Sequence, residues 1–153
     1  MSAERFIRGV TIAAAAVFVV AGAWAFLDPA AFYARVAHFP PYNRHFLHDA
    51  GAFQLGLGAA LVLGLIGWDG RRVALWAAAA GSVLHAASHA LDHDLGGRST
   101  DPLALALVAA ALIAAALLST RTSRPRTEVT NHATAPPAPG VRADRAPRTP
   151  QSR

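Results

Sequence analysis

Long apolar segments dominate the first 118 residues of this chain. They cover residues about 9–27, 46–68, 73–91 and 103–118, each close to the roughly 20 residues that an α-helix needs to cross a bilayer. The hydrophobic fraction of 54% and the charged fraction of only 15% agree with this pattern. Because four spans with short loops use most of the chain, residues 1–118 are predicted to form one all-α domain, a four-helix transmembrane bundle.

The first apolar segment has two interpretations. It follows a basic start with Arg5 and Arg8, and the small residues of Ala21–Ala25 resemble a signal-peptide cleavage site. The apolar run continues through Leu27, which is longer than a signal sequence needs, so an uncleaved span is favoured. In either case, the chain that follows is predicted to begin outside.

A short amphipathic helix is predicted in the loop after this segment. Asp28-Pro29 is a good helix start, because Asp caps helix N-termini and Pro suits the first helical position. Phe32, Val36 and Phe39 follow at helical spacing, and Pro40-Pro41 ends the helix.

Polar side chains gather at the end of the third apolar segment. The run His85-Ala-Ala-Ser-His89-Ala-Leu-Asp92-His93-Asp94 has five ionisable side chains within ten residues. On a helix, His85, His89 and Asp92 lie close to one line, with His93 beside it, because residues three, four and seven apart share a face. His85 lies about 9 Å deeper than Leu91, so it most needs a partner, since ionisable groups within spans are usually paired.

A second polar cluster, His45, His48 and Asp49, begins the second apolar segment. Ala52, Gly56 and Ala60, spaced by four, continue the stripe of Asp49, so this face is predicted to look inward. On the third segment, the side that leads to His85 carries Ala78, Gly81 and Ser82. His48 and Asp49 are therefore the predicted partners of His85, whereas Gln54 faces away and is interpreted as a helix–helix hydrogen-bonding residue.

The arginines predict the topology. All 14 basic residues are arginine, and only Arg35, Arg44 and Arg98 lie outside the N-terminus, the Arg71-Arg72 turn and the C-terminal tail. Short flanks that are rich in arginine stay in the cytoplasm. The sequence therefore predicts a multi-pass cell-membrane protein with both termini cytoplasmic and both polar clusters at the outer face.

The C-terminal segment 119–153 changes to Arg, Pro, Thr and Ala, with few large apolar residues. Such a segment buries too little surface to offset its chain entropy, so a disordered tail is predicted. Its basic charge is interpreted as attraction to anionic lipid of the bilayer rather than to nucleic acid. The last apolar segment, 103–118, contains only Ala, Leu, Val and Ile, and Asp101-Pro102 is predicted to begin its helix.

A divalent metal site is the sharpest functional hypothesis for the polar clusters. Imidazole and carboxylate ligands suit zinc, iron, nickel or manganese, whereas Cu(I) is disfavoured because the chain has no Cys and one Met. The candidate metal ligands are His85, His89, Asp92, His93, His48, Asp49 and His45. Three alternatives stay open: histidines that only hydrogen-bond with their neighbours, a proton-linked role, and bis-histidine haem ligation.

The spacing of these residues does not match known metalloenzyme motifs. Position 86 is Ala, so the Glu of a His-Glu-x-x-His protease is missing, and the Glu-x-x-His repeats of di-iron bundles are absent. We therefore expect a non-enzymatic membrane protein that acts through a partner protein or as a homo-oligomer. The alternative is a membrane-embedded metal- or haem-dependent oxidoreductase, or a subunit of one.

The segment Asn43–Gly58 has an outer polar turn, Asp49 followed by Ala-Gly-Ala, and then a Gly-rich apolar helix. It resembles the second span of small bacterial four-helix membrane proteins, the DoxX-like group and related families of unknown function. This resemblance implies a four-helix bundle and in some cases a redox-associated partner. It implies no catalytic residues.

Overall fold

The computed structural model describes residues 2–67 and 70–122 of the 153-residue chain, and this part is helical with no strand. It contains five α-helices and one π-helical turn. In chain order, they are α1 (Ala3–Leu27), α2 (Pro29–Phe32), η1 (Tyr33–Ala37), α3 (Arg44–Leu65), α4 (Arg71–Leu91) and α5 (Asp101–Thr122). Each long helix covers one of the four predicted apolar segments, with ends that differ by up to six residues, at the start of α1.

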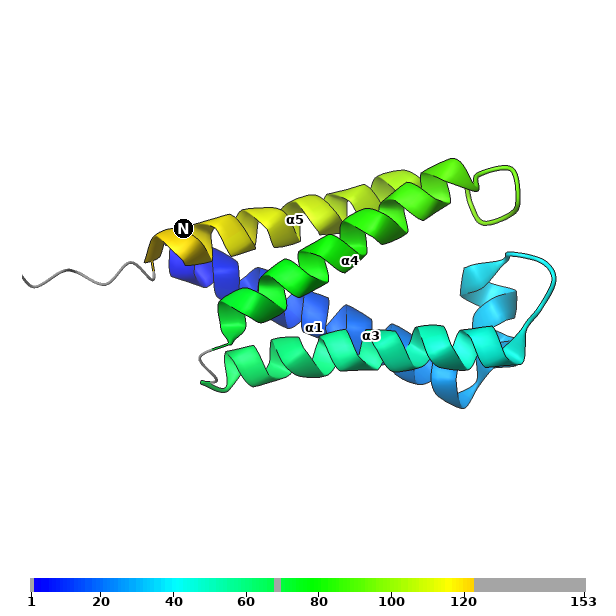
Figure 1. Ribbon diagram of the computed structural model, residues 1–153, viewed down its shortest axis with the longest axis horizontal. Coiled ribbons are helices and arrows are strands. Elements are labelled where there is room, and N and C mark those ends of the chain that lie inside the picture. The colour runs from blue at the N-terminus through cyan, green and yellow to red at the C-terminus, as the bar shows by residue number, and fades with distance from the viewer. Residues whose placement is uncertain (1, 68–69, 123–153) are drawn as a thin grey trace, which may run out of the picture.

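The long helices run side by side, as Figure 1 shows. The most extensive interface joins α1 to α3, a second joins α4 to α5, and smaller contacts join α1 to α5 and α3 to α4. The start of α1 and the end of α5 lie at one end of the molecule, whereas α2, η1 and the α4–α5 loop lie at the other (Figure 1). Both predicted polar clusters therefore lie at the same end.

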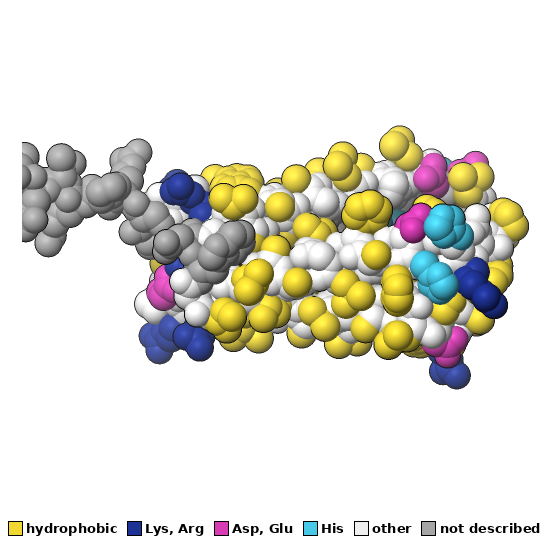
Figure 2. Space-filling view, turned by 60° about the horizontal axis from the view of Figure 1, so that its bottom comes forward, with side chains coloured by type: hydrophobic (Ala, Val, Ile, Leu, Met, Phe, Trp, Pro, Cys, Tyr) yellow, Lys and Arg dark blue, Asp and Glu magenta, His cyan; other side chains and the backbone are white. Residues whose placement is uncertain are grey.

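Three of the helices, α1, α3 and α5, are long and apolar enough to cross a membrane. The predicted third span, α4, is not one of the three, because His85 and His89 lower the mean hydropathy of an otherwise alanine-rich helix. On the face seen in Figure 2, hydrophobic side chains cover the middle of the molecule, and charged side chains lie toward its two ends. These features are those of a membrane protein.

The interior is built mainly from small side chains. Most of its buried residues are alanines and glycines, with Ile7, Leu61, Leu75 and Leu112 among the few large ones. Large side chains such as Val20, Phe53 and Leu103 point outward. Small residues inside and large ones outside allow the close backbone approach that is common between membrane helices.

The α1–α3 interface depends on two glycines that face each other. A Cβ atom at Gly51 would lie 2.8 Å from the carbonyl oxygen of Gly22, and a Cβ at Gly22 would lie 2.9 Å from that of Gly51. The buried face of α3 thus passes through Leu47, Gly51, Gly58 and Leu61. The prediction that the stripe Asp49, Ala52, Gly56 and Ala60 looks inward is wrong for its first three residues, which are exposed because the helix turns Gly51 and Gly58 toward α1. Ala60 is partly buried and packs against the core. The corresponding prediction for α4 is confirmed for Ala78 and Ser82, which are buried.

Local capping explains where the helices at the polar end begin. The side chain of Asp28 accepts a hydrogen bond of 3.1 Å from the backbone N–H of Ala31 and caps α2, as predicted. The side chain of Asn43 accepts one of 3.1 Å from the N–H of Phe46 and caps α3. The predicted loop helix is thus present, but it changes to a π-helical turn at Tyr33 and ends at Ala37, before His38, whose φ is 45°.

The last helix differs from its prediction at one end. It begins at Asp101, as the Asp-Pro pair indicates, but it continues through Thr122. The first residues of the predicted disordered tail are therefore helical. The remainder of that tail, residues 123–153, lies outside the described residues.

Candidate functional site

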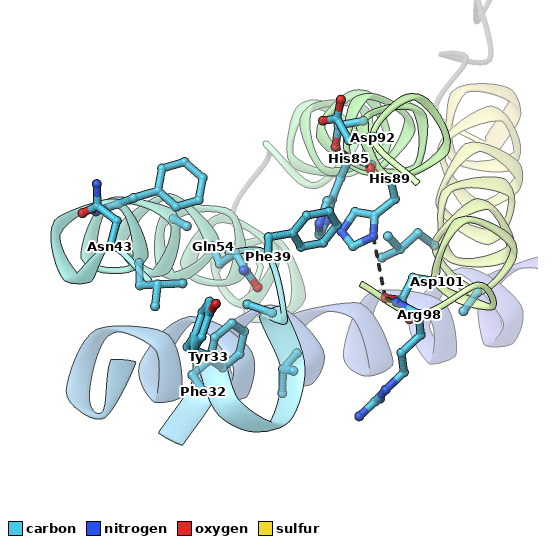
Figure 3. Close-up of a pocket in the computed structure, with 18 of the residues that line it drawn as sticks. Phe32, Tyr33, Phe39, Asn43, Gln54, His85, His89, Asp92, Arg98 and Asp101 are labelled. Carbon is cyan, nitrogen blue, oxygen red and sulfur yellow. Dashed lines mark hydrogen bonds and ion pairs between the residues drawn. The ribbon is translucent and has the colours of Figure 1, made fainter. Parts of the chain in front are cut away.

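A pocket of about 660 Å³ lies at the polar end of the molecule, where the segment 32–43 meets the ends of the long helices. One side of it is apolar and aromatic, with Phe32, Tyr33, Phe39, Phe46 and Leu47 in its wall. The other side is polar. It is formed by His85, Ser88, His89 and Asp92 of α4, Arg98 of the following loop, and Asp101 of α5. Figure 3 shows this arrangement.

His89 is the central side chain of the polar side. Its Nδ1 atom lies 3.8 Å from Oδ2 of Asp101, and the two side chains are only 18% and 22% exposed. The ring of His85 lies next to it, with the ring centroids 4.9 Å apart, and the ring of Phe39 meets it edge-on with centroids 5.1 Å apart. His89 thus lies between an aromatic ring and a carboxylate (Figure 3).

The carboxylate of Asp101 is held by the backbone of the preceding loop. Its Oδ2 atom accepts a hydrogen bond of 2.8 Å from the backbone N–H of Arg98. Asp101 also begins α5, where a negative charge interacts favourably with the helix dipole. These local contacts hold the carboxylate of Asp101 at the start of α5, and the α4–α5 loop brings it beside His89.

The two halves of the pocket are joined by contacts between the segment after α2 and the α4–α5 loop. The backbone N–H of Gly97 donates a 3.3 Å hydrogen bond to the carbonyl of His38, and Nη2 of Arg98 donates one of 2.9 Å to the carbonyl of Arg35. Gly97 has a φ of +75°, and a Cβ atom there would lie 2.9 Å from the ring of Phe39. A glycine is needed here both for its backbone conformation and for this close approach.

The metal ligands predicted on α3, His45, His48 and Asp49, do not line this pocket. Nε2 of His45 lies 3.6 Å from Oδ2 of Asp49, and the two side chains are 87% and 57% exposed. The ring of His48 packs against Phe26 at the end of α1, with centroids 5.2 Å apart. The predicted pairing of His85 with His48 or Asp49 is therefore wrong, because the rotation of α3 that buries Gly51 turns these side chains away from α4.

The seven predicted metal ligands are thus divided among separate places. His85, His89 and Asp92 line the pocket, whereas His93, His45, His48 and Asp49 do not. Within residues 2–67 and 70–122, no group of three or more His, Asp or Glu side chains is arranged to hold a metal ion. The metal site remains a prediction from the sequence.

Several pocket residues were not identified from the sequence as parts of a site. The sequence places Asp101 at a helix start and at the outer edge of the bundle but not among the candidate ligands, and it places Phe39 in the amphipathic loop helix. Gln54, interpreted as a helix–helix hydrogen-bonding residue, lines the pocket instead. One feature of the sequence does indicate a role for Asp101: it directly precedes an apolar run that has no other ionisable side chain.

The chemistry of the polar side follows from these contacts. Nδ1 of His89 lies 3.8 Å from Oδ2 of Asp101, and a neutral ring that carries its proton on Nδ1 leaves Nε2 as a hydrogen-bond acceptor. Other polar groups nearby bond within the protein, since the hydroxyl of Ser88 donates to the carbonyl of His85 over 2.8 Å. The pocket therefore offers a bound molecule a large apolar surface and a histidine corner.

Comparison with known protein families, with curated proteins and with solved structures finds no match for this chain.

Proposed function

We propose that this chain is an integral membrane protein that binds an amphiphilic small molecule in the pocket at its polar end. The observation that carries the proposal is the division of the pocket into an aromatic side and a corner formed by His85, His89 and Asp101. Ligand pockets usually measure about 300–1,000 Å³ and combine apolar walls with a few polar groups that orient the ligand. At about 660 Å³, this pocket has that size and composition.

The proposal is for binding, with the protein acting through a partner, rather than for catalysis. Polar groups at the pocket have partners within the protein, since His89 lies 3.8 Å from Asp101 and the guanidinium of Arg98 bonds to the carbonyl of Arg35. We also propose, from the resemblance of Asn43–Gly58, that the chain is related to the DoxX-like group.

A binding measurement with a matched pair of probes tests this function. Protein in lipid nanodiscs is dialysed against 2-naphthol or naphthalene, which share a ring system and differ by one hydroxyl. We expect saturable binding of one molecule per chain, above that of empty nanodiscs. A hydrogen bond of about 0.5–1.5 kcal/mol to His89 corresponds to roughly 2- to 10-fold tighter binding of 2-naphthol.

Two histidine variants provide the control. His89→Ala should remove the preference for 2-naphthol, whereas His45→Ala should keep it. The pair is matched because each histidine lies within 4 Å of an aspartate, but only His89 lines the pocket. Saturable binding of neither probe would overturn the proposed function.

We further propose that α4 is a fourth span and that both termini are cytoplasmic. This proposal is supported by the length of α4, by its packing along α5 and α3, and by the arginines at its start. The chain has no cysteine, so single cysteines can be labelled without interference. In intact cells, a membrane-impermeant maleimide should label Ser99→Cys, and it should label Arg72→Cys only after permeabilisation. Labelling of both from the same side would contradict a spanning α4.

A metal- or haem-dependent oxidoreductase is the second candidate. It is favoured by the carboxylate of Asp101 beside His89, because metal-ligating histidines usually direct their second ring nitrogen at such a group. Elemental analysis and the visible spectrum of the purified protein decide this point. Stoichiometric zinc or iron, or a Soret band, that is lost in His85→Ala and His89→Ala would favour this candidate over binding alone.

A further inference from the structure

The charged groups that line the pocket carry a net negative charge when its histidines are neutral. They are Asp92, Asp101 and Arg98. Nη2 of Arg98 donates to the carbonyl of Arg35, and its side chain runs away from the corner (Figure 3), so it does not offset the carboxylates. Asp92 is exposed at the end of α4, whereas the side chain of Asp101 is only 22% exposed. Asp101 is therefore the carboxylate that a bound molecule meets inside the pocket.

No arginine side chain neutralises Asp101 in the part of the chain that the structure describes. Its ion pair there is with His89, at 3.8 Å, and its hydrogen bond comes from the backbone N–H of Arg98. An imidazole is uncharged at pH 8, so the negative charge of Asp101 is then uncompensated. A carboxylate in such an enclosed position attracts a cation more strongly than an exposed one, because less water screens its charge.

An aromatic ring lies beside this carboxylate. A Cβ atom at Gly97 would lie 2.9 Å from the ring of Phe39 and 3.2 Å from Oδ2 of Asp101, so the ring and the carboxylate are neighbours. Three further aromatic side chains line the same pocket. The face of an aromatic ring attracts a cation, and rings of this kind commonly bind quaternary ammonium groups. The ring and the carboxylate therefore favour the same ligand charge.

The whole polar end of the molecule has the same sign. Residues 28–49 and 85–101, which form this end, contain five aspartates and three arginines. An excess of negative charge raises the local concentration of cations and lowers that of anions. A positively charged ligand is thus favoured both at this end and inside the pocket.

We propose that the ligand is a hydrophobic cation, an amine or a quaternary ammonium compound with an apolar body. The cationic group binds between the ring of Phe39 and the carboxylate of Asp101, and the apolar body lies against the aromatic side of the pocket. This inference rests on the proposed function, and it adds the charge of the ligand and the two side chains that select it.

Three naphthalene derivatives test the charge of the ligand. 2-Naphthyltrimethylammonium, 2-tert-butylnaphthalene and 2-naphthoate share one ring system and carry a positive, a neutral and a negative substituent. They are dialysed at pH 8 against protein in nanodiscs, and binding to empty nanodiscs is subtracted. We expect the cation to bind saturably at one molecule per chain and several-fold more tightly than the anion.

Replacing Asp101 with asparagine removes the charge but keeps an oxygen that can accept from the N–H of Arg98. Affinity for the cation should fall about 3- to 10-fold, as expected for the loss of one partly screened ion pair, and affinity for the neutral compound should stay the same. Asp49→Asn is the matched control, because Asp49 also lies within 4 Å of a histidine but does not line the pocket. It should leave all three affinities unchanged.

Replacing Phe39 with leucine removes the aromatic ring but keeps an apolar side chain. Phe39→Leu should weaken binding of the cation about 2- to 5-fold relative to the neutral compound, as expected for the loss of one cation–π contact. A loss that is equal for the two compounds would contradict the contact between Phe39 and the cationic group.

The lipid of the nanodisc separates two sources of the cationic group. A choline head that occupied the pocket would compete with the probe in phosphatidylcholine. The difference between the wild-type protein and Asp101→Asn would then be smaller there than in phosphatidylglycerol, which has no choline. An equal difference in both lipids would identify the ligand as a free hydrophobic cation.

The outcomes also separate this inference from the proposed function. Tighter binding of the anion, or equal affinity of the wild-type protein and Asp101→Asn for the cation in both lipids, would overturn the charge of the ligand. Normal 2-naphthol binding in the same preparation would show that the pocket itself still binds. If no compound bound saturably, 2-naphthol included, the proposed function would fail and this inference with it.

Discussion

Replacing Gly51 with alanine tests the close contact between α1 and α3. The new Cβ would lie 2.8 Å from the carbonyl oxygen of Gly22 and 2.9 Å from the backbone nitrogen of Phe26. Ordinary van der Waals contact begins near 3.4 Å, so the helices must separate by about 0.6 Å. Backbone atoms cannot rotate out of the way as a flexible side chain would, and the whole crossing must therefore open.

The cost can be estimated from the dispersion energy that is lost. A gap of 0.5–1 Å removes a quarter to a half of the attraction, which is about 0.15 kcal/mol for each close atom pair. For on the order of 50 atom pairs at the crossing, the loss is about 2 kcal/mol or more. This value lies within the 1–3 kcal/mol that overpacking typically costs.

Reversible unfolding in mixed dodecylmaltoside–SDS micelles, followed by circular dichroism, measures this free energy. Gly56→Ala is the matched control, because Gly56 lies on the same helix and a Cβ there has nothing within 4 Å. We expect Gly51→Ala to lower the free energy of unfolding by about 2 kcal/mol relative to Gly56→Ala. Equal stability of the two variants would refute the close approach.

Gly22→Ala should cost a similar amount of unfolding free energy. The double variant Gly22→Ala/Gly51→Ala should cost less than the sum of the two, because one separation of the helices relieves both contacts.

Three further changes test the other contacts with the same unfolding assay. Asn43→Ala removes the cap of α3 and should cost about 1 kcal/mol, and a value near zero would contradict the capping role. Arg71→Ala breaks the ion pair with Glu4, in which Nη1 lies 2.6 Å from Oε1; it should cost at most about 1 kcal/mol and become neutral in high salt. Gly97→Ala imposes a side chain at a φ of +75° against Phe39, which should cost about 1–3 kcal/mol and weaken 2-naphthol binding; unchanged stability and binding would show that the loop does not hold the pocket.

The positions of the helices could be predicted because they depend on local patterns. An apolar run of about 20 residues has few alternatives to a helix, since its backbone groups must bond within the segment. The capping residue Asp28 and the Asp101-Pro102 pair then mark helix starts, because their effect needs only the next turn of the chain. The end of α5 was misplaced, since Ser119–Thr122 has polar residues that a helix tolerates at its last turn.

The candidate site was only half predicted. His85 and His89 share a face of α4 because they are four residues apart, and this local spacing is enough to place their rings together. The partner of His89 is Asp101, which a loop of nine residues separates from the end of α4. No local pattern predicts that this loop returns Asp101 to His89, or that Phe39 reaches the same ring.

The sequence by itself thus determined that the chain is helical and apolar, where its long helices lie, and that its two histidine clusters share one end. These properties follow from composition, periodicity and the alternation of helix direction. Only the tertiary structure decided which polar groups meet, because that depends on the rotation of each helix about its axis, and one residue changes the direction of a side chain by about 100°. The facing pair Gly22 and Gly51 sets that rotation for α3, so His48 packs against Phe26. The corner around His89 is completed instead by Asp101, which the α4–α5 loop brings back to α4.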